Sequence, residues 1–252
     1  MVKLSVCVDQ VAALRNIIKR GEPDPMTAVM MAQVSGADAV TLSWTSDSSL
    51  YLSGEYDIIR KLVHTHLNMI AMPNLELLQS ILTISPDMVT LVPEGYGHTG
   101  LNNDWFESAW PEGDSLERPV ERMIRELQEN GILTSILIRP AATYVRQCSE
   151  LKTDYVHIDA SQYSQASDPE EKRRVLNEIA STAKTAIRLN MGVSVGRGVD
   201  YRTVADISGL AEVEEVVIGY AIAVRAMTIG YEQAVRDLVD IIRHAPRPPV
   251  DW

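Results

Sequence analysis

Cysteine is scarce in this sequence: only Cys7 and Cys148 are present, far apart and without a CxxC pair or a Cys/His cluster. A disulfide framework needs several cysteines, and a structural zinc site needs closely spaced thiol or imidazole ligands. The sequence therefore predicts two reduced thiols, no disulfide and no metal site.

Long hydrophobic runs are also absent from the N-terminal region. Met1-Val2-Lys3 and a short apolar run lead directly into the polar pair Asp9-Gln10. Neither a secretory hydrophobic region nor a transmembrane span can be drawn there. We therefore expect a cytoplasmic protein that does not contact a membrane.

Positive charge is in the minority, with 23 Lys and Arg against 34 Asp and Glu and a formal net charge of −11. General affinity for nucleic acid or for an anionic membrane requires a basic surface. Both classes of partner are therefore excluded, and an anionic ligand would need a local positive site.

Alternation is the main positive signal: short β-branched runs alternate with longer amphipathic stretches, as in repeated βα units around a parallel sheet. Eight strands are predicted, the number that closes a barrel, and the 252 residues match the roughly 250 of a typical TIM barrel. The predicted strands are Leu4 to Val8, Ala39 to Leu42, Asn68 to Ala71, Met88 to Val92, Leu133 to Ile138, Tyr155 to Ile158, Gly192 to Val195 and Glu215 to Ile218. We predict a single (β/α)8 TIM barrel over residues 1–244, followed by a proline-rich tail over residues 245–252.

Two Asp-Pro pairs predict helix starts, because Asp caps a helix and Pro is tolerated at the first helical position. Asp24-Pro25 predicts a helix over 26–34, and Asp168-Pro169 predicts one over 170–190. An amphipathic stretch predicts another helix over 115–130. Three glycines are predicted to mark helix ends before strands: Gly36, Gly131 and Gly192.

A long insertion, residues 95–114, follows the fourth predicted strand and carries Trp105, Phe106 and Trp110. Loops of this length inside a compact domain are often lids or binding loops. Large rings also fill subunit interfaces, so both interpretations stay open.

Two glycine turns give the strongest signal for a binding site, because TIM-barrel active sites lie at the carboxyl ends of the strands. Gly196-Arg197-Gly198 follows the seventh predicted strand, and Gly219-Tyr220 follows the eighth. Glycines let backbone N–H groups approach an anion, and a following helix N-terminus attracts it. We predict a phosphate site there, with Arg197 adding positive charge.

Four residues near other strand ends are candidates for proton transfer or hydroxyl binding: Asp9, Glu94, His157 and Asp159. The alternative for the carboxylates is a cap or a loop salt bridge, and for His157 a hydrogen-bonded core histidine. Because side chains alternate along a strand, His157 and Asp159 are predicted to share one face with Tyr155.

Further candidates for ligand contact lie near the first two predicted strands. Gln10 and Ser43 directly follow these strands. Arg15, one turn into the first predicted helix, would reach a second anion, whereas a lone helical arginine can also be solvated or ion-paired.

Several short motifs occur together and in order: Val8-Asp9, Leu14-Arg15-Asn16, Pro23-Asp24-Pro25, Gly36-Ala37-Asp38, Leu91-Val92-Pro93-Glu94 and Ile218-Gly219. From about Leu4 to Arg243 the sequence resembles the pyridoxine 5′-phosphate synthase family, octameric TIM barrels of vitamin B6 biosynthesis. The resemblance implies a homo-oligomer, an octamer by analogy, and phosphorylated small-molecule ligands. That family closes a pyridine ring from 1-deoxy-xylulose 5-phosphate and an amino-ketone phosphate.

The sequence departs from the family where proton-transferring residues are expected. The first-strand Asn-x-Asp-His reads Cys7-Val8-Asp9-Gln10, while other expected histidines or glutamates fall on Ser43, Ile70, His157 and Arg197. An isoleucine cannot transfer a proton, and an arginine is a poor general base at neutral pH. What survives of the family pattern is its anion-binding frame: Arg15, Gly196, Gly198 and Gly219.

These observations predict a divergent family member that binds a small phosphorylated metabolite and catalyses an altered proton-transfer or condensation reaction. No cofactor is predicted. One alternative is a catalytically silent barrel that binds a phosphate ligand such as a B6 vitamer or serves as an assembly partner, and another is the family reaction with rearranged residues. Trp44, Tyr51 and the aromatic insertion are the expected subunit contacts.

Overall fold

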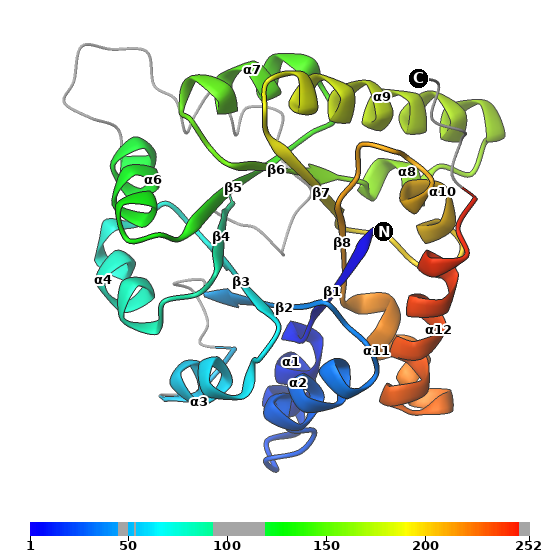
Figure 1. The fold of residues 1–252 in the computed structure, drawn as a ribbon. Coiled ribbons are helices and arrows are strands. Elements are labelled where there is room, and N and C mark those ends of the chain that lie inside the picture. The colour runs from blue at the N-terminus through cyan, green and yellow to red at the C-terminus, as the bar shows by residue number, and fades with distance from the viewer. Residues whose placement is uncertain (45–49, 53, 93–118, 247–252) are drawn as a thin grey trace.

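The computed structural model describes residues 1–44, 50–52, 54–92 and 119–246. Within them, parallel strands β1 to β8 form a closed barrel in chain order, surrounded by helices (Figure 1). The predicted single TIM barrel is confirmed. Glu94, the aromatic insertion over 95–114 and residues 247–252 of the predicted tail lie outside the described residues.

The strands are β1 (Lys3–Cys7), β2 (Ala39–Trp44), β3 (His66–Ala71), β4 (Met88–Leu91), β5 (Leu133–Ile138), β6 (Tyr155–Asp159), β7 (Gly192–Gly196) and β8 (Glu215–Ile218). No predicted strand end differs from these bounds by more than two residues. The barrel closes because β1 pairs with β8, with Lys3 opposite Glu215 and Val6 opposite Ile218.

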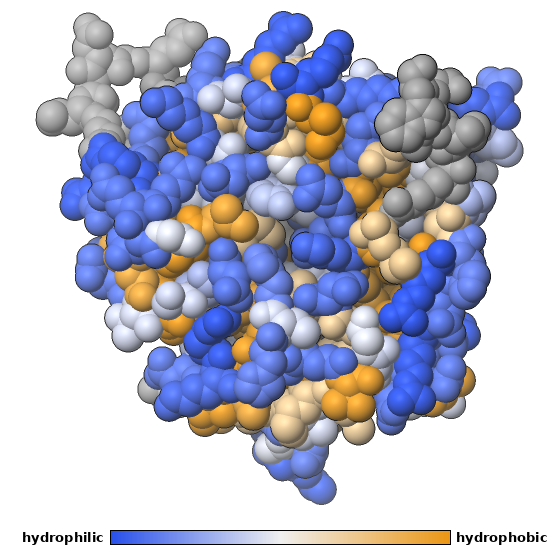
Figure 2. All heavy atoms as spheres, in the orientation of Figure 1, coloured by the Kyte–Doolittle hydropathy of each residue, from blue (hydrophilic) through white to orange (hydrophobic). Residues whose placement is uncertain are grey.

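The helices are α1 (Asp9–Ile18), α2 (Pro25–Val34), α3 (Glu55–Leu62), α4 (Leu75–Ile84), α6 (Pro119–Glu129), α7 (Ala142–Glu150), α8 (Ser161–Gln165), α9 (Pro169–Arg188), α10 (Val204–Ser208), α11 (Tyr220–Ile229) and α12 (Tyr231–Arg243). Asp24 and Asp168 cap α2 and α9 with their side chains, and a proline follows each, as predicted. None of the described helices is long and apolar enough to cross a membrane. On the face seen in Figure 2, hydrophilic side chains predominate and apolar ones show between them.

Two of the three predicted glycine helix ends are confirmed. Gly36 and Gly131 follow α2 and α6 with φ of +99° and +75°, in the left-handed region that glycine tolerates. The prediction for Gly192 is wrong, because α9 ends at Arg188 and Gly192 is the first residue of β7. A Cβ at Gly192 would lie 2.2 Å from the Tyr155 ring, so this glycine makes room for an aromatic side chain.

The strand register stacks inward side chains in layers of four, each taken from alternate strands, as in other TIM barrels. One central layer holds Ser5, Asn68, Ser135 and Ser194, and the next layer toward the carboxyl ends holds Thr41, Thr90, His157 and Val217. Branched apolar residues usually dominate these positions. The middle of this barrel is instead polar.

Hydrogen bonds between neighbouring strands join several of these polar side chains. The Ser5 and Thr41 hydroxyls lie 2.7 Å apart, and the Thr90 hydroxyl donates to Asn68 Oδ1 at 3.0 Å. The outward-facing residues of the same strands, such as Leu4 and Val6, are buried in the apolar core between barrel and helices. Hydrophobic stabilisation therefore comes mainly from that outer core.

Candidate functional site

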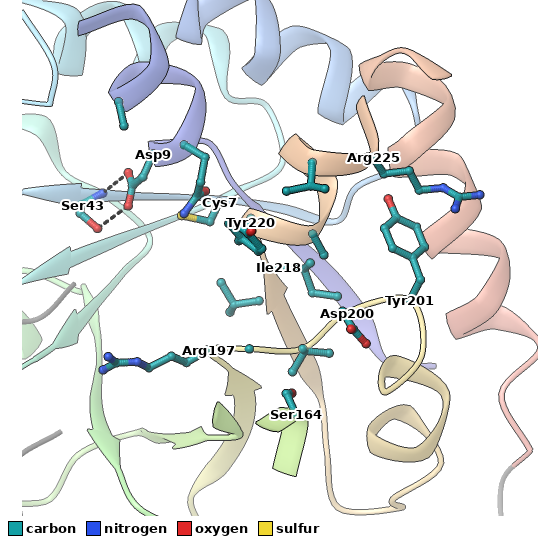
Figure 3. A pocket seen from close by; sticks show the side chains of 18 of the residues that line it. Cys7, Asp9, Ser43, Ser164, Arg197, Asp200, Tyr201, Ile218, Tyr220 and Arg225 are labelled. Atoms are coloured by element: carbon teal, nitrogen blue, oxygen red, sulfur yellow. Dashed lines mark hydrogen bonds between the residues drawn. The ribbon is translucent and has the colours of Figure 1, made fainter. Parts of the chain in front are cut away.

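A cavity of about 1010 Å³ opens at the carboxyl ends of the strands, on the side where β1 and β2 lie near β7 and β8 (Figure 3). Its position matches the usual place of a TIM-barrel active site. Eight of the predicted site residues line it: Asp9, Gln10, Ser43, His157, Arg197, Gly198, Gly219 and Tyr220.

Asp9 is the first residue of α1, directly after β1. Its carboxylate accepts hydrogen bonds from the Ser43 backbone N–H at 2.9 Å and the Ser43 hydroxyl at 2.5 Å (Figure 3). It also accepts one from the Tyr51 hydroxyl at 2.8 Å. Three donors occupy most of the acceptor capacity of a carboxylate. Asp9 therefore orients Ser43 and Tyr51 in this structure.

The expected subunit contact at Tyr51 is wrong, because this side chain is only 1% exposed. Burial and the negative charge of Asp9 hold the pKa of the Tyr51 phenol well above its ordinary value. Trp44 stacks on Tyr56 with ring centroids 4.3 Å apart. These rings support the wall of the site behind Ser43, since the Tyr56 hydroxyl donates to the Ser43 carbonyl.

Gln10 and Cys7 pack against Gly219 at the edge of the cavity. A Cβ at Gly219 would lie 2.3 Å from Gln10 Oε1 and 2.9 Å from Cys7 Cβ, so only glycine allows this close approach. Gln10 Oε1 is buried and has no hydrogen-bond partner within the described part of the chain. Burial, followed by the negative charge of Asp9, raises the pKa of the Cys7 thiol, which keeps it protonated at neutral pH.

His157 projects from β6 into the barrel and is 3% exposed. Its Nδ1 lies 2.8 Å from the Ser194 hydroxyl. Burial, followed by the positive charge of Arg197, lowers the pKa of His157 to about 4. The imidazole is therefore neutral at pH 7, with Nδ1 engaged by Ser194.

Gly196 supplies the space for the other ring nitrogen, since a Cβ there would lie 2.6 Å from His157 Nε2. We expect Gly196→Ala to lower the free energy of unfolding by about 1–3 kcal/mol, the usual cost of overpacking a buried site. Chemical denaturation measures this loss. In a His157→Ala background the nearest remaining neighbour of the added methyl is the Val217 carbonyl at 3.1 Å, so the loss should be smaller. An undiminished loss in that background would contradict this explanation.

Arg197 and Asp159 form an ion pair at the barrel mouth, with Arg197 Nε 3.8 Å from Asp159 Oδ2. Asp159 is 5% exposed and also accepts the backbone N–H of Ser161 at the start of α8. Arg197 has a φ of +61° and extends across the mouth in Figure 3. Asp159 thus holds Arg197 in place and is not itself a wall of the cavity.

The N-terminus of α11 opens onto the cavity through Gly219, Tyr220 and Ala221. Its N-cap residue, Gly219, has no side chain to cap the first N–H groups of the helix. These N–H groups and the positive end of the helix dipole attract anions. Arg197 lines the same cavity, so two groups that attract anions face it.

Arg15 lies away from the cavity lining and is 5% exposed. Its guanidinium makes a bidentate contact with Glu55, at 2.5 Å and 3.1 Å, and also donates to the Leu50 carbonyl. The structure thus shows the ion pair that was one of the alternatives for this residue. An anion-binding role for Arg15 stays a prediction.

Sequence reasoning missed Tyr51, Ser194 and Glu55 as partners of site residues. Ser194 carried a usable signal, because it lies two residues before Gly196 and so faces the same interior. No sequence signal links Tyr51 to Asp9 or Glu55 to Arg15, since the partners lie about forty residues apart. Within the described ranges, no group of three or more His, Cys, Asp or Glu residues is placed to hold a metal ion.

Comparisons with known proteins agree along almost the whole chain. A family model described as pyridoxal phosphate biosynthesis protein PdxJ matches residues 4–244. A pyridoxine 5′-phosphate synthase from Geobacter metallireducens is 31% identical over 245 residues, covering 97% of this chain and 100% of the relative. One from Syntrophobacter fumaroxidans is 29% identical over 242 residues, covering 96% and 99%.

Solved structures add only a likeness of fold. Thiamine phosphate pyrophosphorylase from Pyrococcus furiosus superimposes with a TM-score of 0.61 at 14% identity, covering 97% of this chain and 96% of that one. Identity this low supports the barrel architecture and says nothing of activity.

Proposed function

We propose that this protein, which belongs to the PdxJ family of pyridoxal phosphate biosynthesis proteins, binds a small phosphorylated metabolite in its cavity. It then transfers a proton to or from that metabolite, in a reaction that differs from the pyridine ring closure of the family. The observation that carries this proposal is the uncapped N-terminus of α11, which opens onto the cavity that Arg197 also lines. A phosphate there would accept hydrogen bonds from the first backbone N–H groups of α11 and a charge-assisted hydrogen bond from Arg197.

His157 is the best candidate for proton transfer among the described residues. Asp9 is occupied by three donors and Asp159 by Arg197, whereas His157 Nε2 points toward the floor of the cavity beside Gly196. A neutral imidazole whose Nδ1 is hydrogen-bonded can accept a proton at Nε2. A bound phosphate would offset Arg197 electrostatically and so raise the proton affinity of His157.

A catalytically silent phosphate binder is the second candidate, and one observation favours it. Ile70 lines the cavity at the position where the family resemblance implies an acid/base glutamate. It packs with Met72, Val92 and Leu137 in an apolar cluster. No group in that cluster can carry a proton.

Calorimetric titration tests the binding proposal directly. We expect wild type to bind at least one of inorganic phosphate, pyridoxine 5′-phosphate, pyridoxal 5′-phosphate and 1-deoxy-xylulose 5-phosphate. Arg197→Ala should weaken that binding by roughly 10- to 100-fold, the value of a hydrogen bond to a charged group. Arg174→Ala, at an exposed position on α9, is the matched control and should change nothing.

Incubation of the bound ligand in D2O separates the two candidates. Deuterium at a carbon-bound position, lost in His157→Gln, supports proton transfer, and its absence favours a silent binder. If wild type binds none of the four compounds, the phosphate proposal is wrong.

A further inference from the structure

The floor of the cavity is a layer of four inward residues with little polarity. The register places Cys7, Ile70, Leu137 and Gly196 in this layer, one step above Thr41, Thr90, His157 and Val217. Cys7 holds a protonated thiol, and the other three side chains have no polar group. A ligand that reaches the floor on the β3 side therefore meets hydrocarbon.

Ile70 is the floor residue on that side and is packed among apolar side chains. It is 4% exposed and lines the cavity, and it is backed by Met72, Val92 and Leu137, none more than 9% exposed. These four residues form a cluster of their own, separate from the main core outside the barrel. A close-packed apolar wall of this kind cannot turn a polar group toward the ligand.

Ser43 and Thr90 are the strand neighbours of Ile70, and their hydroxyls donate to Asp9 and Asn68 rather than toward Ile70. Asp9 and Ser43 bond to each other, His157 bonds to Ser194, and Arg197 crosses the mouth. A ligand hydroxyl placed against Ile70 would lose its water without a replacement hydrogen bond, which is costly. A methyl group or ring placed there would gain from leaving water.

We propose that the ligand is an amphipathic phosphate monoester whose phosphate binds at α11 and Arg197 and whose far end is an apolar ring or alkyl group seated on Ile70. This inference rests on the proposed function, because it assumes that a phosphate occupies the α11 end. The cavity volume of about 1010 Å³ leaves ample room for such a group beyond the phosphate.

The test compares three ligands that share a phosphate: inorganic phosphate, glycerol 1-phosphate and benzyl phosphate. We expect wild type to bind benzyl phosphate at least about tenfold more tightly than glycerol 1-phosphate, in keeping with the effect of small apolar groups in a hydrophobic pocket. Ile70→Asn should remove most of this preference and leave the affinity for inorganic phosphate within about twofold. Ile70→Leu, which conserves volume and polarity, should keep the preference.

Ile70→Ala serves where the asparagine variant does not fold, and it too should reduce the preference for benzyl phosphate about tenfold. Equal affinity for benzyl and glycerol phosphates, or a preference unchanged in Ile70→Ala, overturns the inference. In either case binding of inorganic phosphate that Arg197→Ala weakens would leave the proposed function standing. Failure of all three ligands to bind wild type would overturn both.

Discussion

Replacing Arg15 by methionine is expected to lower the free energy of unfolding by about 3–5 kcal/mol, the range observed when one partner of a buried ion pair is removed. Arg15 and Glu55 are 6% and 8% exposed at their side chains and pair at 2.5 Å. Without Arg15, the Glu55 carboxylate stays buried, and among the described residues only the Leu52 backbone N–H donates to it. Denaturant unfolding of the two proteins measures the difference.

A double variant separates the loss of the pair from the loss of packing. Arg15→Met with Glu55→Met removes both charges, and we expect it to recover much of the stability lost in the single variant. Arg60→Met is the matched control, because Arg60 and Asp87 form a pair that is 31% and 37% exposed and worth about 1 kcal/mol or less. A double variant no more stable than Arg15→Met would contradict the role of the buried charge.

Replacing Glu215 by glutamine is expected to change how stability depends on pH. Glu215 is 7% exposed inside the barrel, its Oε1 has no partner within the described residues, and burial raises its pKa from 4.5 to about 7, against the opposing charge of Lys3. Between these pH values the unfolded chain releases the proton and the folded chain keeps it. The free energy of unfolding of wild type therefore falls as pH rises through this window, by about 3 kcal/mol in total.

Glu215→Gln removes this loss. Its stability relative to wild type should be about 3 kcal/mol more favourable at pH 8 than at pH 4, because any packing change contributes equally at both values. Glu150→Gln, at an exposed position at the end of α7, is the control and should show no such difference. Equal effects of Glu215→Gln at the two pH values would show that this carboxyl titrates in the folded protein as it does in the unfolded chain.

Most of the fold could be predicted because its signals are local. Each strand is a short β-branched run, and the Asp-Pro pairs that open α2 and α9 act within one helical turn. Gly192 could not be interpreted in the same way. The Tyr155 ring occupies the space that a side chain at position 192 would fill. Tyr155 lies on the neighbouring strand and reaches this position through the pairing of β6 with β7.

In the candidate site, too, features with a local sequence signal could be predicted and contacts between distant residues could not. Its strand-end residues could be predicted from position alone, because the carboxyl ends of all eight strands meet at one face. Their hydrogen-bond partners were harder to predict. The spacing of Ser194 from Gly196 places it on the face of His157, but nothing in the sequence links Asp9 to Tyr51, 42 residues away. A contact such as that of Asp9 with Tyr51 depends on tertiary packing, and no short sequence pattern encodes it.

The pairing of β1 with β8 also bears on how the chain folds during synthesis. Residues 3–7 leave the ribosome well before their partners at 215–218, because the rest of the barrel lies between them in the sequence. Until those arrive, β1 and the newest strand both present unpaired edges, which can join other chains. A nascent chain stalled before residue 215 is therefore the species that most needs a chaperone.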